Sequence, residues 1–591
     1  MSNLIYFTVI LYRSMIEYIW VMKMFLKRDK RPNGRIYLSI VKGFRDPITK
    51  KNKQRAVKSI GFLDEFEDLY DDPIEHFKSL AEKMTEQEKL KNAPLEFSFD
   101  RLESVNEAET LRKNFGFVIL RYIYHKLNID YFLDNKQQSL NIDFSLNKIL
   151  QALSFLRVIE PSSKKKSTEL LEGYFIDSDF SIDDVYRSLN YFCKYKKELI
   201  LHIHEYIRYE YGRSLDNVFY DVTNYYFESD EDDFRKKGVS KEHRPNPIIQ
   251  MGLLMDDEGI PITFKLFEGN TNDCNTLMPV LDELKRDFNL GRVIVVADKG
   301  MNSGENIAYN IINKNGYIYS KSVRGSTQEV KEFVLNDNGY EDMGDEYKFK
   351  SRLVNTNIWI ANSKGKRVQA EIDQKQVVFY SDKYARKARK DRQKVLDKAN
   401  KLIALKKGKL DKGAYKYIKD EYLDKKTGEI LKKDDYLYLD EEKIAEEEKY
   451  DGYYLIVSSE LKMSDGDIIE RYRGLWKIEE SFKITKSQLK SRPVYLRKKD
   501  HIEAHFLICF LALIFIRLLE KETAFKYSIS TLINSIKNLS VTYLDENYYM
   551  LDYVDEVSKS FGEILNTDMT KRFWRQSDIK NLIANSKKKD L

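Results

Sequence analysis

The spacing of hydrophobic and polar positions divides the chain into segments with different secondary structure. Two β-branched runs at residues 35–41 and 55–63 flank a connection that contains Gly and Pro, which predicts a small β unit. Between residues 107 and 213 the apolar positions recur with a helical period, which predicts an all-α domain. Residues 214–319 then alternate β-type runs with helical ones, as in an α/β core.

The second half of the chain resumes this α/β pattern after a long interruption. Residues 320–450 alternate short β-type segments and include a charge-rich helix over residues 384–407, which indicates an inserted β-rich domain. A strand at residues 451–459 and a helix after it return to the core. We therefore predict an α/β RNase H-like core interrupted by a mainly β insertion domain, preceded by a small β unit and an all-α domain.

Composition narrows the chemistry that this core can perform. The 591 residues are 42% hydrophobic and 33% charged, which is typical of a globular protein with several cores. The net charge of +6 is the difference between 100 basic and 94 acidic residues, so local clustering matters more than the sum. Three cysteines without CxxC or Cys/His spacing argue against a zinc site or disulfides and fit a reducing cytoplasm. Oxygen ligands must then hold any metal.

Two apolar stretches raise the question of a membrane. The first, at residues 4–11, is followed by charged positions well before the ~20 residues that a bilayer span needs. It also lacks the basic start and the cleavage site of a signal peptide. The second, at residues 506–516, is too short to span and predicts a buried helix. We expect no membrane association.

Two aspartates follow apolar runs of the predicted core. Asp221 comes after NVFY and Asp298 after VIVVA, so each is expected near the carboxyl end of a strand, where α/β folds place their sites. Without cysteine or histidine clusters, phosphodiester chemistry can use two Mg²⁺ (or Mn²⁺) ions that carboxylates hold. A strand-end aspartate is structural more often than catalytic, so the interpretation requires a third acid.

The basic, aromatic stretch from Tyr472 to Lys486 offers two adjacent candidates for that acid. On a continuous α-helix, residues seven apart return to nearly the same azimuth, so Tyr472, Glu479 and Lys486 form one stripe. Glu480 points ~100° away, beside Arg473 and other cations. We therefore select Glu479 as the third acid and expect Glu480 to be a surface salt-bridge partner.

These residues resemble the DDE-type transposases of bacterial insertion sequences, in the branch with a Tyr-Arg-Glu-Lys signature and a β-strand insertion before the catalytic glutamate. Tyr472, Glu479 and Lys486 fall in register with that signature. DVT at Asp221, ADKGMNSGENI at Asp298 and FEGNTNDCNTL between them resemble further motifs of the family. The signature arginine is replaced by Leu475, and Arg471 or Arg473 could substitute for it only from another azimuth.

The resemblance implies an enzyme that binds the terminal inverted repeats of its mobile element on double-stranded DNA, pairs two ends as a homodimer, and cleaves and joins DNA strands. It implies two Mg²⁺ ions at the three acids and a cytoplasmic, nucleoid-associated location. Trp359 is expected to be a core residue, with stacking of a flipped base as the alternative. Two alternatives stay open: a catalytically inactive transposase-derived DNA-binding protein, and an RNase H-like nuclease or resolvase that cleaves without joining.

The predictions for individual residues and segments follow from this interpretation. The predicted catalytic and metal-binding residues are Asp221, Asp298 and Glu479, and the predicted DNA-binding residues are Tyr472, Arg473, Lys486, Lys490 and Arg492. A basic helix carries Arg386, Lys387, Arg389, Lys390, Arg392 and Lys394. For each residue alone a solvated helix face is the common role, but together they indicate a helix that follows the DNA backbone. The predicted segments are 1–106 (extension and small β/α unit), 107–213 (all-α, DNA binding), 214–319 (first part of the core), 320–450 (insertion), 451–540 (second part, with the catalytic helix) and 541–591 (C-terminal tail).

Overall fold

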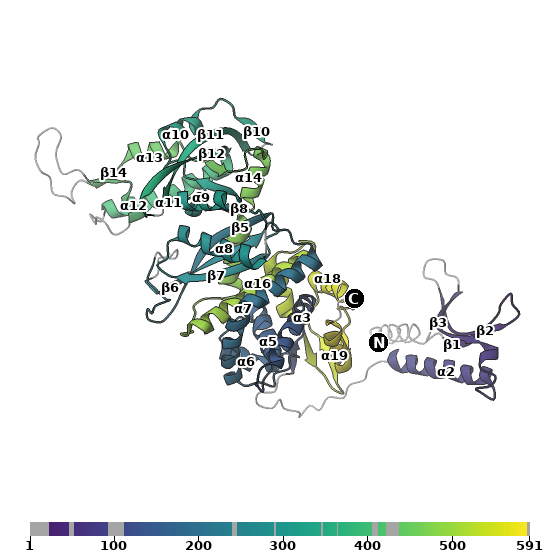
Figure 1. Cartoon of the computed structure of the whole chain (residues 1–591). Coiled ribbons are helices and arrows are strands. Elements are labelled where there is room, and N and C mark those ends of the chain that lie inside the picture. Colours follow the sequence, from purple (N-terminus) through teal and green to yellow (C-terminus); the bar gives the residue numbers. More distant parts are fainter. Residues whose placement is uncertain are drawn as a thin grey trace, which may run out of the picture. The chain divides into compact units, whose positions relative to one another are not determined.

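The computed structural model describes residues 23–45, 52–92, 111–238, 245–288, 291–343, 347–362, 364–404, 412–420 and 437–587 (Figure 1). The apolar stretch at residues 4–11 lies outside these ranges. Contacts divide the chain into two units, Met1–Val105 and Asn106–Leu591.

The first unit is a three-stranded antiparallel sheet covered by one helix. Its strands are β1 (Met24–Lys30), β2 (Ile36–Arg45) and β3 (Asn52–Phe62), in the order β1-β2-β3. A short 3₁₀ turn (Leu63–Glu65) leads to helix α2 (Pro73–Asn92), which packs on β1. Met24, Ile40 and Ala81 form the small core between sheet and helix. The predicted β unit of residues 35–63 corresponds to strands β2 and β3. Strand β1 before them and helix α2 after them complete the fold of the unit.

The second unit is built on a nine-stranded sheet of order β10-β11-β12-β15-β9-β8-β5-β6-β7. Five of its strands are β5 (Asn217–Tyr226), β6 (Ile248–Asp256), β7 (Pro261–Glu268), β8 (Ile294–Ala297) and β9 (Gly316–Lys321). The first three form an antiparallel meander, β8 pairs in parallel with β5, and β9 pairs in parallel with β8. This mixed sheet is the predicted RNase H-like arrangement.

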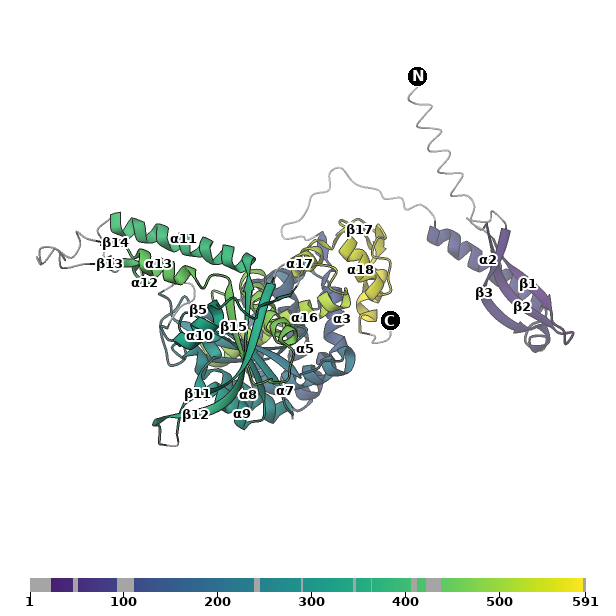
Figure 2. The same cartoon turned by 90° about the horizontal axis from the view of Figure 1, so that it is seen from above.

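The segment predicted as an inserted domain extends the same sheet instead of forming a separate layer. Its strands are β10 (Glu341–Met343), β11 (Tyr347–Ala361), β12 (Arg367–Ser381) and the returning β15 (Tyr453–Ser458). β11 and β12 form a long hairpin, and β15 joins β12 to β9. The remaining elements of the segment are α10 (Gln328–Leu335), α11 (Asp382–Ala404), α12 (Lys412–Tyr415), β13 (Ile418–Asp420), β14 (Leu437–Leu439) and α13 (Glu441–Glu448). α11 runs beside α12 and α13 on the outside of the unit (Figure 2).

Helices cover both faces of the sheet. α8 (Leu277–Phe288) and α9 (Gly304–Ile312) pack on the face that presents Tyr220, Val295 and Tyr319. α14 (Asp465–Arg473), α15 (Trp476–Lys483) and the long α16 (Lys499–Glu522) pack on the opposite face. Successive strand residues point to opposite faces, so each strand contributes to both cores.

The predicted all-α domain shares its core with this second face. Its helices are α3 (Phe117–Lys126), α4 (Ile129–Gln138), α5 (Leu146–Ile159), α6 (Lys164–Leu170) and α7 (Ile182–Tyr211), which surround α16. Among the helices within the described ranges, α16 alone is long and apolar enough to cross a bilayer, but 94% of its apolar window is buried. The prediction of a buried helix at residues 506–516 is confirmed.

The prediction of a C-terminal tail is wrong, because the described residues after 541, as far as Lys587, contribute to a second folded layer. Strand β4 (Arg112–Asn114) pairs with β16 (Ser540–Tyr543) in a sheet of order β18-β17-β16-β4, so this layer includes the strand that precedes α3. β17 (Tyr548–Leu551), β18 (Phe573–Arg575), α17 (Ile529–Asn538), α18 (Glu556–Ile564) and α19 (Gln576–Asn585) complete this layer.

A buried ion pair ties the end of α7 to the core sheet. Arg213 donates from Nε to Asp256 Oδ2 at 2.8 Å and from its Nη2 to the Pro261 carbonyl at 2.9 Å. Asp256 also accepts from the backbone N–H of Ile260 at 2.8 Å, and both charged side chains are almost fully buried. The pair therefore fixes the helical layer against the β6–β7 turn.

We predict that Asp256→Ala lowers the free energy of unfolding by about 3–5 kcal/mol, because it leaves Arg213 buried and unpaired. Asp391→Ala is the matched control, since it breaks an exposed pair with Lys394 and should cost less than about 1 kcal/mol. Urea denaturation followed by tryptophan fluorescence measures both changes. Equal effects would contradict a structural role for the buried pair.

Candidate active site

Two acids lie side by side where the parallel pairing of β5 and β8 ends. Tyr220 is opposite Ala297 in this pairing, so Asp221 and Asp298 each come one residue later. Alternation places both on the face of Phe219 and Val296, which is the face covered by α15 and α16. Neighbouring strands are about 4.8 Å apart, so the two carboxylates project from adjacent backbones in the same direction.

The predicted strand-end position is right for Asp298 and wrong for Asp221. β8 ends at Ala297, and Asp298 begins the following 3₁₀ turn (Lys299–Met301). β5 continues from Asp221 to Tyr226 because β6 pairs with it along this whole stretch. Asp221 is therefore a mid-strand residue with its side chain half-buried, and its Oδ1 accepts from the Val222 N–H at 2.7 Å.

Hydroxyl groups from two other elements donate to Asp298. Ser320 of β9 donates from Oγ to Asp298 Oδ1 at 2.7 Å, and Tyr472 of α14 approaches the same oxygen at 3.5 Å. Burial raises the pKa of Tyr472, and Asp298 and Glu479 raise it further. The phenol therefore stays protonated and can donate to the carboxylate. Both contacts involve Oδ1, so among the residues that the structure describes Oδ2 is the oxygen left for another ligand.

The stretch that carries the third acid is not one continuous α-helix, as the stripe argument assumed. α14 ends at Arg473, Gly474 and Leu475 form a turn, α15 begins at Trp476, and a π-helical turn occupies Ile484–Gln488. The backbone N–H groups of Leu475 and Ile478 each bond three residues back, which tightens the helix, and the π turn then widens it. The stripe of residues seven apart, which assumes one continuous α-helix, therefore does not apply to Tyr472, Glu479 and Lys486.

Gly474 brings this segment close to the strand that carries Asp221. A Cβ at Gly474 would lie 2.6 Å from the Cζ atom of Phe219, so only a residue without a side chain fits. Beyond α15, the Thr485 hydroxyl is 3.0 Å from the hydroxyl of Tyr225. Phe219, Asp221 and Tyr225 share one face of β5, so the segment that contains Glu479 is fixed to that face on both sides of Asp221.

Glu479 and Glu480 have different environments. Glu480 accepts from the buried Arg517 of α16 at 2.8 Å, which makes it a salt-bridge partner as predicted, although its partner is buried rather than at the surface. The Glu479 side chain is exposed. Burial raises the pKa of Tyr454 on β15, and the charges of Tyr384, Asp298 and Glu479 raise it further. The charges of Asp298 and Glu479 raise the pKa values of both Tyr454 and Tyr472, so these two acids lie near the same pair of tyrosines.

The oxygen ligands of Asp221, Asp298 and Glu479 are of the kind that a hard divalent cation binds, although the three carboxylates do not surround one metal position in this structure. Within the described ranges, no three His, Cys, Asp or Glu side chains already surround a metal position. Carboxylate and hydroxyl oxygens are the ligands that Mg²⁺ prefers, and it commonly completes its shell with water and substrate phosphate. Two acids from adjacent strands and one from the helix packed on them match that requirement.

Comparison with known protein families identifies the family of the chain. Residues 220–515 match the transposase DDE domain, a range that contains Asp221, Asp298 and Glu479. The chain belongs to the DDE transposase family. Residues 26–94 match the N-terminal domain of the IS1634 family of transposases, which coincides with the first folded unit. No curated protein matches the chain. The protein is thus a transposase of an insertion sequence, with DNA as its partner, and its family uses divalent metal ions.

The predicted DNA-binding residues of this transposase lie on or after the π turn and beside the third acid. Lys486 Nζ lies 5.4 Å from the ring centre of Tyr225, and the Arg492 guanidinium lies 5.7 Å from that of Tyr226. The Lys490 side chain is exposed. Tyr225 and Tyr226 end the strand that carries Asp221, so Lys486 and Arg492 lie at the end of that strand, four and five residues beyond Asp221.

Leu475, which stands at the position of the signature arginine, and the two nearby arginines, Arg471 and Arg473, each contact a different part of the protein. Leu475 is buried in the hydrophobic core, which explains why an arginine is absent there. Arg471 bonds the side chain of Asn217, and Arg473 lies 4.7 Å from the ring centre of Tyr347. Arg473 is exposed and lies six residues before Glu479. Membership of the Tyr-Arg-Glu-Lys branch stays a prediction.

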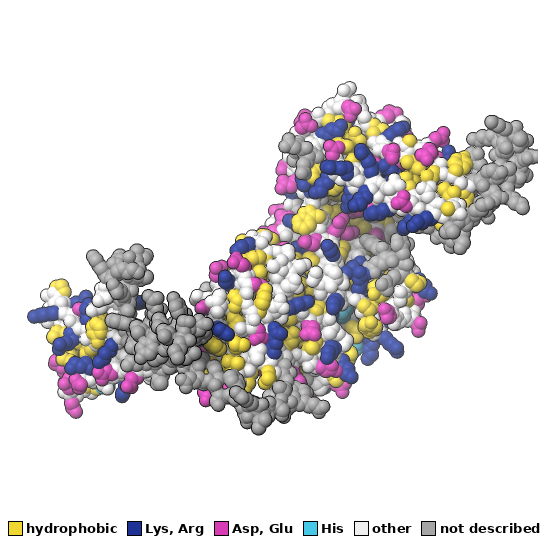
Figure 3. Space-filling model, turned by 180° about the vertical axis from the view of Figure 1, so that it is seen from behind, with side chains coloured by type: hydrophobic (Ala, Val, Ile, Leu, Met, Phe, Trp, Pro, Cys, Tyr) yellow, Lys and Arg dark blue, Asp and Glu magenta, His cyan; other side chains and the backbone are white. Residues whose placement is uncertain are grey.

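One residue of the predicted basic helix has a structural role. Arg392 is buried in ion pairs with Asp451 at 2.6 Å and Glu448 at 3.1 Å, so the expectation that it follows the DNA backbone is wrong. Its neighbours seven residues away, Ala385 and Ala399, are also buried, which marks the inner face of α11. Arg386, Lys387, Arg389 and Lys390 are exposed. Lys and Arg side chains gather over this part of the molecule on the face shown in Figure 3.

Trp359 is a surface residue, so the expectation of a core tryptophan is wrong. Its side chain is 53% exposed on the long β11–β12 hairpin. A Cβ at Gly304 would lie 1.9 Å from the Trp359 carbonyl oxygen, so the hairpin backbone rests on the start of α9. The pocket beside it has a volume of about 360 Å³ and is lined by Asn302, Ser303, Lys321 and Arg367 among others. This pocket borders the loop that begins at Asp298.

The sequence interpretation missed Ser320, Tyr454 and Gly474. Ser320 lies two residues after the buried Ile318, so alternation in GYIYSK could have placed it on the acid face. Its nearness to Asp298 depends on the β8–β9 register, in which Ala297 is opposite Tyr319. Gly474 stood inside a predicted helix, where a glycine is costly, and this was the available signal of a close contact.

We predict that Gly474→Ala displaces α15 from β5 and lowers the free energy of unfolding by about 1–3 kcal/mol, because the added methyl group meets the ring of Phe219. It should also abolish DNA cleavage, since the shift moves Glu479 away from Asp221. Gly173→Ala is the control, because a Cβ there meets no atom within 4 Å. Retention of full cleavage by Gly474→Ala would contradict the proposed packing.

Proposed function

We propose that this chain is an active transposase that binds the terminal inverted repeats of its insertion sequence and catalyses metal-dependent cleavage and strand transfer. The observation that carries the proposal is the convergence of Asp221 and Asp298 on one sheet face under the segment that holds Glu479. The third acid comes from a separate element, α15, and its neighbour Glu480 is already paired with Arg517.

Asp221, Asp298 and Glu479 would hold two Mg²⁺ (or Mn²⁺) ions. When bound, the ions activate the attacking oxygen and stabilise the leaving oxygen of the phosphodiester. Ser320 and Tyr472 orient the Asp298 carboxylate by hydrogen bonds to one of its oxygens, so the other is directed toward the ligand. Tyr472 thereby acts at the site itself, in addition to any contact that it makes with DNA.

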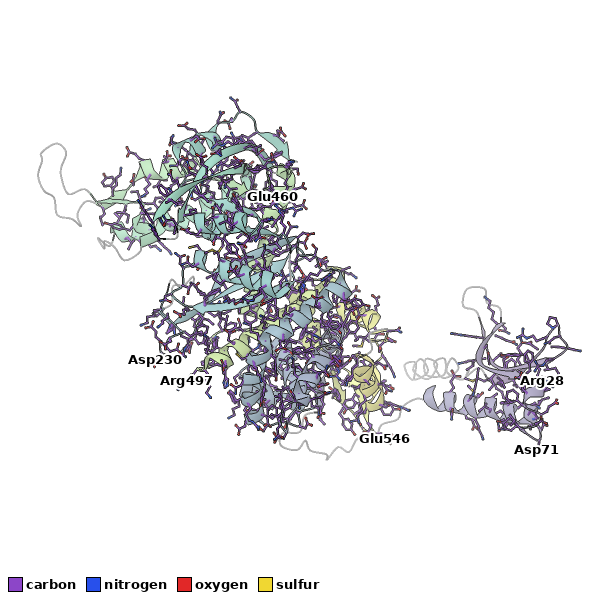
Figure 4. The ribbon with its side chains drawn as sticks, in the orientation of Figure 1. Arg28, Asp71, Asp230, Glu460, Arg497 and Glu546 are labelled. Atoms are coloured by element: carbon purple, nitrogen blue, oxygen red, sulfur yellow. The ribbon has the colours of Figure 1, made fainter. Side chains whose placement is uncertain are left out.

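The cations around this region would bind DNA phosphates. Lys486, Lys490 and Arg492 follow the third acid directly, and Arg473 precedes it, so they would hold the strand near the scissile phosphate. Arg497 is exposed just before α16 (Figure 4), and the outer face of α11 adds further cations. Such contacts position DNA without reading its sequence and weaken with salt.

The all-α helices, which were predicted to bind DNA, would add one further DNA contact, and the first folded unit would add another. The strands of the first unit carry mainly cations, such as Arg28, and its connection to α2 carries mainly acids, such as Asp71 (Figure 4). A basic sheet with an acidic opposite end favours one orientation on DNA. Two chains would join as a homodimer to pair the element ends.

Incubation of the protein with DNA that carries the inverted repeats flanking its gene tests this function. With Mg²⁺ we expect nicks at the element boundary and joining of the freed 3′ end to a target plasmid, and with EDTA neither product. Specific binding without cleavage would favour the inactive DNA-binding protein. Cleavage without joining would favour the nuclease or resolvase and would contradict our proposal.

We predict that Asp221→Asn, Asp298→Asn and Glu479→Gln each reduce cleavage by at least 10³-fold, because each removes a charged metal ligand, while end binding in gel-shift assays is kept. Glu480→Gln is the matched control beside the third acid. It should keep cleavage and lower stability, since it weakens the pair with Arg517. Loss of cleavage in Glu480→Gln but not in Glu479→Gln would reverse the assignment.

We predict that Trp359→Ala keeps end binding but weakens extrusion of a base at the cleaved end, because base stacking on an aromatic side chain contributes about 1–3 kcal/mol. 2-Aminopurine placed at the terminal positions of the element reports extrusion as an increase in fluorescence. Trp476→Ala, a second exposed tryptophan, is the comparison. An unchanged signal in Trp359→Ala would exclude this role.

A further inference from the structure

A cluster of three basic side chains is buried beneath the DNA-binding segment. Arg157 of α5, Lys164 of α6 and His505 of α16 are 5%, 5% and 7% exposed. Lys164 Nζ lies 3.4 Å from His505 Nδ1, and Cys509 Sγ lies 3.8 Å from His505 Nε2. In the part of the chain that the structure describes, no carboxylate forms an ion pair with any of the three. We call these three residues the anchoring cluster.

The anchoring cluster binds backbone carbonyls of the loop after the π turn. Arg157 Nη1 donates to the carbonyls of Leu489 at 3.4 Å and Lys490 at 3.5 Å. His505 Nε2 is 3.1 Å from the carbonyl of Ser491. A carbonyl oxygen only accepts, so Nε2 carries the proton and Nδ1 is left to accept from Lys164. Lys164 therefore sets the tautomer with which His505 holds the loop.

The same loop is joined to the strand that carries Asp221. The backbone N–H and the hydroxyl of Ser491 both donate to the carbonyl of Thr485, at 3.0 and 2.8 Å. The Thr485 hydroxyl meets the hydroxyl of Tyr225, and Lys486 lies over the ring of that tyrosine. A chain of contacts thus runs from Lys164 through His505, Ser491 and Thr485 to β5.

The loop has a conformation that needs such support. Lys490 has φ +42°, in the left-handed region that residues with a side chain rarely adopt. The π turn before it leaves the carbonyl of Thr485 without its usual helical donor, and Ser491 supplies the replacement. Without these bonds the segment could return to regular geometry, and Lys490 and Arg492 would change direction.

We propose that Arg157, Lys164 and His505 are positioning residues that hold Lys486–Arg492 in the conformation that meets DNA phosphates. The inference rests on the proposed function of this segment in DNA binding. A buried lysine without an acidic partner opposes folding, and an apolar residue of similar size would fit the interior better. The cluster is consequently better explained by the placement of the loop than by stability.

The titration of Lys164 separates these two explanations. Burial, together with the charge of Arg157, lowers the pKa of Lys164 to about 7, and the Cys509 thiol is the one group that raises it. Its ordinary pKa is about 10.4, so the unfolded chain keeps the proton to higher pH. The buried charge of Lys164 therefore lowers the free energy of unfolding by its full amount below pH 7. This loss of stability decreases as the pH rises and vanishes above the ordinary lysine pKa. Lys164→Met should therefore stabilise the protein at pH 6.

The test measures how end binding by the complete transposase depends on salt. Each phosphate contact contributes about 0.9 to the slope of log Kobs against log[salt], so Arg492→Gln, as reference, should lower the slope by about 0.9. Lys164→Met and His505→Leu should lower it by about 1–2 at a temperature where both are folded. His505→Gln keeps an N–H donor for Ser491 and should restore the slope. His501→Leu, one turn earlier on α16, should leave it unchanged.

The outcomes separate this inference from the function on which it rests. If the wild-type protein shows no binding to element ends, the proposed function fails. If Arg492→Gln lowers the slope while Lys164→Met and His505→Leu do not, the anchoring role is overturned. Should His505→Leu fail to fold, Lys164→Met decides, because it is expected to gain stability at pH 6 and to lose phosphate contacts together. Loss of stability with an unchanged slope would show a purely structural cluster.

Discussion

The parallel register of β5 and β8 is the constraint on which the rest of the site depends. With Tyr220 opposite Ala297, the next residue on each strand is an aspartate, and alternation sends both to the same face. A shift of one residue in β8 would turn Asp298 toward α8 and α9 and leave Asp221 without a neighbouring acid. The apolar core on both faces opposes such a shift, because Val295 and Val296 would exchange environments. The hydrophobic pattern therefore holds the acids together.

The second requirement is a helix that approaches this face closely enough to add the third acid. Gly474 permits the contact with Phe219, and α16 supports the segment from behind. α16 is also the centre around which α3, α5 and α7 pack, so the all-α region acts as the foundation of the catalytic segment. The all-α region thus contributes to the site without supplying any of the acids.

The local hydrophobic pattern was sufficient to predict where the strand before Asp298 ends. Asp298 follows a continuous apolar run, and such a run ends where the buried strand ends. Asp221 was misplaced because the length of β5 is set by β6, a partner whose register the sequence does not state. Strands between residues 320 and 450 were recognised, but their union with the core sheet depends on β15, which pairs across 70 residues or more with β12 and across more than 130 with β9. Arg392 could have been recognised, since its seven-residue spacing from Ala385 and Ala399 marks one helix face.

The choice between Glu479 and Glu480 shows how the scaffold assigns roles to adjacent residues. Glu479 was selected on the assumption of one ideal helix. The segment instead consists of a tight turn, a short helix and a π turn. Arg517 supplies a different reason for the same selection. It is buried, it donates to the Glu480 carboxylate at 2.8 Å and to the Ser481 hydroxyl at 2.9 Å, and so it fixes the rotation of α15. Because a buried guanidinium requires a partner, Glu480 is committed to the core. The rotation that satisfies Arg517 leaves Glu479 exposed beside Tyr472, facing the region of Asp298.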